Sequence, residues 1–235
     1  MNFYYDPKTD FLFKKIFGKC KWMTKSLLNS ILKLKGKKKI SRILYLSPIL
    51  PLSDDELNCV IDIECTNKEK DIFIVELRMC YSASILRKEF LCKYCELFNK
   101  LNKDGILNSS VKKVIMINIL DDIYFSNNET KCSFHDFNLS NDNDRNIILS
   151  MFQIVHIELP KFNPKAYYRN KMLKLWLTFL TTINGGMDHN RDIPNELLIN
   201  NTTFEAINIC KNLSKKEIEE YKIFWSYHKH AISSL

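Results

Sequence analysis

Two short β-rich segments in the first half of the chain carry acidic residues at a spacing suited to metal chemistry. Residues 58–65 and 71–78 are rich in Ile, Val and Cys, and a polar stretch separates them. This pattern predicts an antiparallel hairpin. If its turn is centred on Glu69, residues whose numbers sum to 138 face each other, and Asp62 lies opposite Glu76.

The hairpin would gather charged side chains on one face. Because side chains alternate along a strand, Glu64 joins Asp62 there and Arg78 joins Glu76. Facing carboxylates destabilise a sheet unless a cation neutralises them, and Mg²⁺ prefers a few carboxylate oxygens together with waters and phosphate oxygens. Asp62 and Glu76 could therefore support metal-assisted phosphodiester hydrolysis. The alternative is a solvated hairpin edge with cross-strand ion pairs.

Helical and strand patterns surround the hairpin. Apolar residues recur at three- and four-residue steps in some segments, and form short continuous runs in others. This order predicts an α/β or α+β fold with a helical C-terminal part. The expected helices cover residues 9–18, 23–33, 82–101, 167–181, 204–213 and 215–230, the further strands cover 40–46, 111–120 and 153–159, and 138–146 is expected to be a loop.

The hairpin and its flanking segments resemble a known family. Asp62, followed fourteen residues later by Glu76-Leu-Arg78, is similar to the PD-(D/E)XK nuclease motif. Asp10–Gly18 resembles the D-x-x-F-K-x-x-F-G opening of the Rpn group of recombination-promoting nucleases and transposases. Further similarities follow in order at Arg87 and in residues 114–121, 157–162 and 176–180. The resemblance spans about residues 5–183.

The resemblance implies a restriction-endonuclease-like α/β core, a mixed β-sheet flanked by helices, in residues 1–183. Residues 184–235 would form a helical C-terminal extension. The implied activity is divalent-metal-dependent DNA endonuclease cleavage of the recombination-promoting or transposase type, as found in mobile elements. The implied site residues are Asp62, Glu76 and Arg78 for catalysis, Asp62 and Glu76 for Mg²⁺ or Mn²⁺, Asp10 as an accessory acidic residue, and Lys14, Lys15 and Arg87 for DNA.

Arg78 stands where this family usually has Gln and where the wider superfamily has Lys. An arginine keeps a positive charge near the phosphate but cannot act as a general base. Ile49 and Asn58 also stand where an acidic residue and a lysine would be expected. A second hypothesis is therefore a weakened or inactive family remnant that binds DNA or a partner protein without cleavage. A third is an interaction module unrelated to nucleic acid.

The net charge of +8 arises from 35 Lys and Arg against 27 Asp and Glu, and many of the lysines lie within residues 14–39. Such a cluster is either a solvated surface or a phosphate-facing patch. We take DNA as the expected partner, with a homodimer as a further partner to test.

The N-terminus has no leader character, and no apolar run reaches the roughly 18 residues of a membrane helix. We expect an intracellular protein of the cytoplasm or nucleus, not secreted and without a membrane partner.

Two other groups of residues favour core packing over chemistry. Cys92 and Cys95 have metal-ligand spacing, but they form one lone pair in a helical pattern, so core packing is favoured over zinc. Phe13, Phe17 and Trp22 recur at roughly helical spacing and are expected in the core rather than as stacking platforms for bases.

Overall fold

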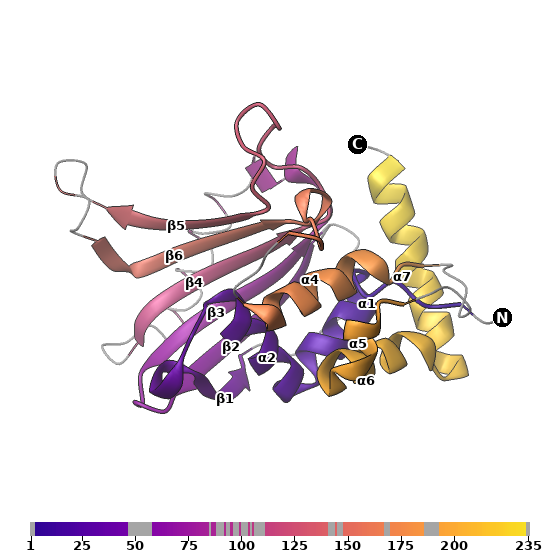
Figure 1. Ribbon diagram of the computed structural model, residues 1–235, viewed down its shortest axis with the longest axis horizontal. Coiled ribbons are helices and arrows are strands. Elements are labelled where there is room, and N and C mark those ends of the chain that lie inside the picture. Colours follow the sequence, from indigo (N-terminus) through magenta and orange to yellow (C-terminus); the bar gives the residue numbers. More distant parts are fainter. Residues whose placement is uncertain are drawn as a thin grey trace. The chain divides into compact units, whose positions relative to one another are not determined.

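The computed structural model divides the chain into two compact units (Figure 1). The helical unit comprises Met1–Lys35, Pro48–Ile61 and Phe162–Leu235, and the sheet unit comprises Gly36–Ser47 and Asp62–Lys161. The residues that the structure describes are 3–46, 58–84, 86, 87, 92, 95, 99, 103, 105, 111–140, 144, 148–166, 170–185 and 193–233.

A mixed six-stranded sheet has the strand order β1-β2-β3-β4-β6-β5. Its inner strands β3 and β4 pair in parallel, as do β4 and β6, while β1 and β5 add to the two edges in antiparallel orientation. Every residue of β3 after the first is buried, as its near-continuous apolar sequence requires for a central strand. The strands are β1 Ile40–Tyr45, β2 Asn58–Asn67, β3 Ile72–Cys80, β4 Val111–Leu120, β5 Phe134–Ser140 and β6 Ile148–Glu158.

The sixth strand, β5, was not predicted. Its sequence Phe-His-Asp-Phe-Asn-Leu-Ser contains His, Asp and Asn, and an edge strand needs few apolar residues. The expectation of a loop over 138–146 is wrong for residues 138–140, which pair with β6. By contrast, the strand predicted over 111–120 has those bounds in β4.

The helical unit contains short helices from both ends of the chain. They are α1 Asp10–Phe13, the π-helical turn η1 Lys14–Gly18, α2 Lys21–Ile31, α4 Lys171–Thr182, α5 Asn195–Ile199, α6 Asn201–Lys211 and α7 Lys215–Ser233. The sheet unit adds the short 3₁₀ turns η2 Gly36–Lys38 and η3 Leu159–Lys161. Much of the helix predicted over 82–101 lies outside the described residues. Within the described part of the chain, no helix is long and apolar enough to cross a membrane.

An aromatic chain forms the core of the helical unit. The rings of Phe13 and Phe17 lie 4.9 Å apart, and Phe17 lies 5.2 Å from Trp176, all three being fully buried. The indole Nε1 of Trp176 donates to Ser26 Oγ at 3.1 Å, which satisfies its buried donor. The core prediction is confirmed for Phe13 and Phe17 and is wrong for Trp22, which is 41% exposed.

The C-terminal helices pack with the N-terminal segment in the same unit. The backbone N–H of Tyr5 donates to the Cys210 carbonyl at 2.9 Å, and that of Asp6 donates to the Tyr221 hydroxyl at 3.0 Å. The division of the chain at residues 183 and 184 stays a prediction. The α/β class is confirmed: a mixed sheet, with helices toward the C-terminus, is consistent with a restriction-endonuclease-like fold.

Candidate active site

The turn between β2 and β3 has the pairing on which the predicted site depends. The N–H of Asn67 donates to the Asp71 carbonyl at 3.1 Å, and the N–H of Lys70 donates to the Asn67 carbonyl at 3.2 Å. Lys70 adopts a positive φ of 66°, which closes the turn. If the pairing continues from Asn67 and Asp71 without a bulge, Asp62 lies opposite Glu76 on the neighbouring strand.

Three charged side chains of this hairpin are buried. Asp62, Glu76 and Arg78 are 8%, 4% and 4% exposed. The guanidinium Nε of Arg78 donates to Glu76 Oε1 as a buried ion pair along one strand face. Charges inside a protein are stable only when they are paired and hydrogen-bonded, so this contact explains how the sheet accommodates them.

The guanidinium interacts with both carboxylates. Burial alone would lower the pKa of Arg78, but the charge and hydrogen bond of Glu76 and the charge of Asp62 raise it above its ordinary value. Arg78 is therefore a permanent cation, as arginine is in proteins generally. The Arg78 guanidinium thus links the two buried carboxylates electrostatically.

The donor chemistry of the pair fits a small divalent cation. Mg²⁺ is commonly held by one or two carboxylates, with waters and phosphate oxygens completing its shell, and Asp62 with Glu76 supplies such a partial shell. The predicted third carboxylate, Glu64, does not complete a cluster: across the described residues, no three His, Cys, Asp or Glu side chains are grouped so that they could hold an ion. Cys92 and Cys95 are both exposed, so the expectation that they pack in the core is wrong.

One known protein family matches most of the chain. A model of PD-(D/E)XK nuclease family transposases matches residues 7–231. The chain belongs to this family. Its match includes the hairpin as well as α5, α6 and most of α7. No curated protein and no solved structure matches the chain. The family points to a nuclease or transposase role.

The other residues to which the resemblance assigns a role contact residues outside the group of Asp62, Glu76 and Arg78. In the helical unit, Asp10 is 4% exposed and lies 2.8 Å from Lys14 Nζ, one turn along the chain. Lys15 forms an ion pair with Glu217 of α7. In the sheet unit, the exposed Arg87 stacks its guanidinium over the Tyr124 ring, 4.9 Å from the centroid. Their expected roles stay predictions.

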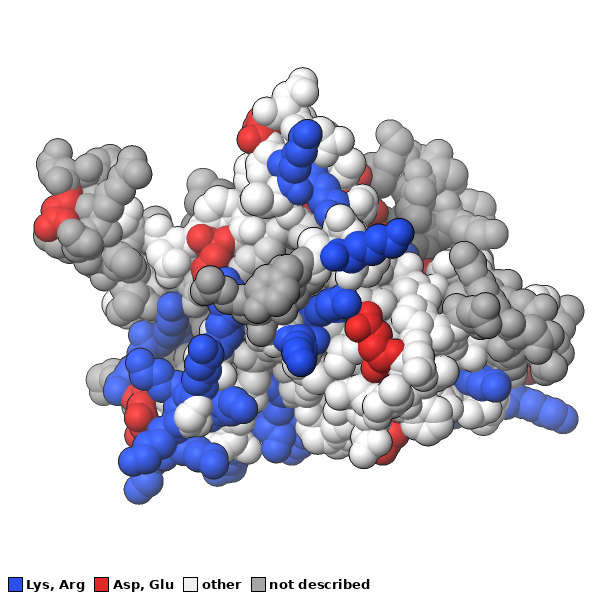
Figure 2. All heavy atoms as spheres, viewed as in Figure 1, with Lys and Arg blue, Asp and Glu red and all other residues white. Residues whose placement is uncertain are grey.

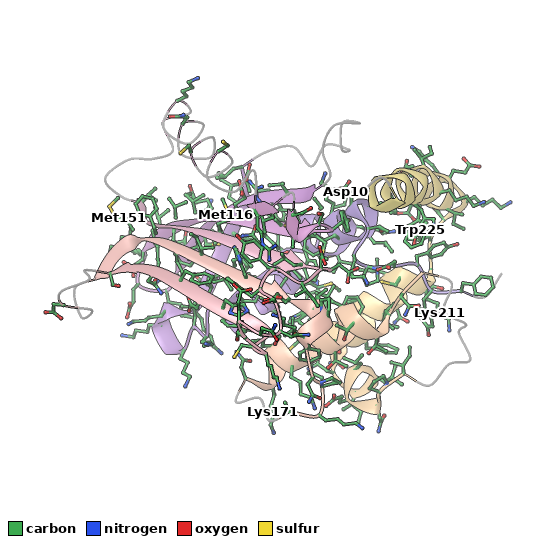
Figure 3. All side chains as sticks on the ribbon, turned by 90° about the horizontal axis from the view of Figure 1, so that it is seen from above. Asp10, Met116, Met151, Lys171, Lys211 and Trp225 are labelled. Atoms are coloured by element: carbon green, nitrogen blue, oxygen red, sulfur yellow. The ribbon has the colours of Figure 1, made fainter. Side chains whose placement is uncertain are left out.

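The sheet extends the site by a row of polar side chains that sequence reasoning missed. Arg78 on β3 pairs with Asn118 on β4, Asn118 with His156 on β6, and His156 with His135 on β5. Partners in register project from one face of the sheet, and Met116 (labelled in Figure 3), two residues before Asn118 on β4, shares that face. Asn118 is fully buried, and its Nδ2 has no hydrogen-bond partner among the described residues. Strand order, which no local motif reveals, creates this row.

Exposed cations gather at the turn end of the hairpin. Figure 2 shows Lys and Arg side chains massed at its lower left, over β1 and the β2–β3 turn. The N–H of Lys68 donates to the Lys37 carbonyl at 3.0 Å, so η2 and the hairpin tip are joined. We call this surface the basic end; within the sheet unit it consists of the exposed residues Lys37, Lys38, Lys39, Arg42, Lys68 and Lys70.

We expect the row's buried histidine to make the protein sensitive to acid. Burial, and then the nearby His135, lower the pKa of His156 to about 4 from an ordinary 6.5. A histidine with a lowered pKa binds protons more readily in the unfolded chain, so its contribution is complete above about pH 6.5 and is lost as the pH falls toward about 4. His156→Phe, which keeps an aromatic ring beside Tyr124, should remove this dependence.

Urea unfolding of both proteins at about pH 7 and about pH 5 measures the effect. Wild type should lose roughly 2 kcal/mol more than His156→Phe over this interval. Equal losses in the two proteins would show that His156 does not titrate as its burial requires.

Proposed function

We propose that the chain is a divalent-metal-dependent DNA endonuclease of the recombination-promoting or transposase type, which hydrolyses phosphodiester bonds. The observation that carries the proposal is the buried group Asp62, Glu76 and Arg78 on one hairpin of a chain that belongs to a nuclease family. Structural sheets rarely bury two carboxylates with a single cation, whereas metal-assisted phosphoryl chemistry needs such a set.

Asp62 and Glu76 would hold Mg²⁺ or Mn²⁺. When bound, the ion would lower the pKa of a water molecule and neutralise charge on the phosphodiester. The carboxylates would contribute by their fixed placement: both side chains are buried on adjacent strands rather than on loops. Rigid placement of charged groups avoids reorganisation during the reaction.

Arg78 would bind the phosphate and position Glu76. Its Nε is used by Glu76, and a guanidinium has further N–H groups in a planar fork that suits phosphate oxygens. Because it keeps its proton, Arg78 cannot take one from water. The site therefore differs from superfamily members with lysine at this position, and proton removal would depend on the metal-bound water itself.

The basic end would guide the DNA backbone toward the site. Its cations are exposed, whereas Lys14 and Lys15 are engaged by Asp10 and Glu217. Phosphate contacts by Lys14 or Lys15 would have to compete with these ion pairs. Arg87 is exposed and remains a candidate contact.

Removal of the carboxylates tests the catalytic assignment. Purified wild type with Mg²⁺ or Mn²⁺ should nick supercoiled plasmid, and Asp62→Asn and Glu76→Gln should each lower the rate by roughly 100-fold or more, as loss of a preorganised charged group does. Asp136→Asn is the matched control, since this carboxylate lies on β5 of the same sheet and is exposed. Its rate should equal wild type. If the two site variants also cut at the wild-type rate, catalysis does not occur at this site.

A second function is favoured by one specific contact. The ion pair between Arg78 and Glu76 already gives one ligand a cationic partner, and a metal would have to displace or share it. A protein in which the pair never opens would bind DNA without cutting it. Plasmid nicking separates the two functions: salt-sensitive DNA binding with no metal-stimulated product would support the non-catalytic one.

DNA binding through the basic end predicts a specific salt dependence. Replacing Lys37, Lys38 and Lys39 together by Ala should weaken duplex binding at low salt. It should also reduce the slope of log affinity against log salt by up to about 0.9 for each phosphate that the protein no longer neutralises. Fluorescence anisotropy with a labelled duplex over a salt series measures both quantities.

The control variant removes three lysines from another part of the chain. Lys211, Lys215 and Lys222 are exposed residues at or beyond the end of α6, and their triple Ala variant should keep most of the wild-type slope. If the two triple variants reduce the slope equally, net charge rather than the basic end determines binding.

A further inference from the structure

Five aromatic and histidine rings contact one another near the β5 edge of the sheet. Their centroids lie 4.8 to 6.2 Å apart. Phe137 is 41% exposed, and His156 is buried at 3%. Core aromatics are normally covered, so an exposed ring backed by other rings suggests a binding surface. We call the cluster the aromatic shelf; it consists of Tyr124, Phe125, His135, Phe137 and His156.

Buried charged groups hold the aromatic shelf in place. Glu158 is fully buried, accepts from the Tyr124 N–H at 2.9 Å, and lies 2.8 Å from His135 Nε2 and 3.0 Å from Lys161 Nζ. Lys161 Nζ in turn donates to the Phe125 carbonyl at 2.5 Å. The network thus holds the His135 side chain and the backbone of Tyr124 and Phe125, and groups held in place lose little entropy when a ligand binds.

The aromatic shelf and the catalytic carboxylates share one face of the sheet. Glu76 is in register with Met116, Met116 with Ile154, and Ile154 with Phe137. Three strand spacings separate Glu76 from Phe137, or about 14 Å. A stacked DNA strand covers this length in about four nucleotides at roughly 3.4 Å each. A strand held at the carboxylates would therefore reach the shelf within a few nucleotides.

The charges around the aromatic shelf favour a nucleic acid as its ligand. Arg87 is exposed and stacks on Tyr124, which belongs to the shelf. A cation in the same cluster as an exposed ring is a combination by which proteins bind single-stranded nucleic acids, because every base has a π-face and every linkage has a negative charge. Sheets that present aromatic residues bind unpaired bases in this way.

We propose that the aromatic shelf stacks an unpaired base of the DNA strand whose phosphate lies at Asp62 and Glu76. The inference rests on the proposed nuclease function and narrows its substrate. A base in a regular duplex is stacked on both sides and cannot reach a protein ring. The preferred DNA therefore carries a single-stranded, flapped or mismatched segment next to the cleavage position, and Phe137 supplies the exposed stacking face.

Binding by Phe137 variants tests the proposal. The full chain is titrated, with EDTA present to prevent cleavage, against a labelled single-stranded oligonucleotide and against a fully paired duplex of the same length. Phe137→Ala should weaken single-strand binding by roughly 5- to 100-fold, the loss expected from one stacked base, and leave duplex binding unchanged. Phe137→Trp should keep single-strand affinity, while Phe137→Leu, which is apolar but has no π-face, should lose it.

Phe204 on α6 provides a matched control, since its side chain is 43% exposed and belongs to the helical unit. Phe204→Ala should bind both DNAs as wild type does. The proposal is overturned if Phe137→Ala changes neither affinity or both equally, or if Phe137→Leu binds single strands like wild type. Thermal unfolding of each variant, together with its duplex affinity, shows that the fold is kept.

The experiments can support the aromatic shelf and reject the nuclease proposal, or the reverse. A selective loss in Phe137→Ala without any metal-stimulated nicking by wild type would support the shelf and reject catalysis. Nicking by wild type with no selective loss would support catalysis and reject the shelf.

Discussion

The burial of three charges on one hairpin is the constraint on which the rest of this structure depends. Asp62 and Glu76 lie on adjacent strands with little access to water, and such carboxylates are tolerated only beside a cation. Arg78 provides it through its bond to Glu76. Glutamine, which the related nucleases usually carry there, could supply a hydrogen bond but no charge. Arginine therefore supplies the cation that the buried Glu76 requires, and a metal bound there would have to compete with it.

The neighbouring strands place further polar side chains in register with Arg78. β3 and β4 are buried and pair in parallel, so Arg78 comes into register with polar residues on strands far along the chain. On the same face, the fully buried Glu158 contacts the aromatic shelf together with Lys161 of η3. The groups proposed to hold a metal and a phosphate and the groups proposed to receive a base thus lie on one sheet, and preorganised sites require such a scaffold.

Sequence patterns predicted those features of the fold that depend on residues close together in the sequence. Alternation and the polar stretch between the strands predicted the hairpin, and its turn is closed between Asn67 and Asp71. The continuous apolar run of β4 predicted its bounds. Strand β5 was missed because an edge strand with polar residues has no strong local signal. The row through Asn118 and His156 was missed because strands far apart in sequence create it. Trp22 was misplaced, since helical spacing alone does not say which face is covered.

The most direct test of the account is where a divalent cation binds. A crystal of the wild-type protein soaked in Mn²⁺ and measured for anomalous scattering would locate the ion. The account predicts a peak bonded to carboxylate oxygens of both Asp62 and Glu76, with the Arg78 guanidinium turned away from the oxygen that the ion takes. Absence of a peak at saturating Mn²⁺, with the Arg78 and Glu76 pair intact, would contradict it.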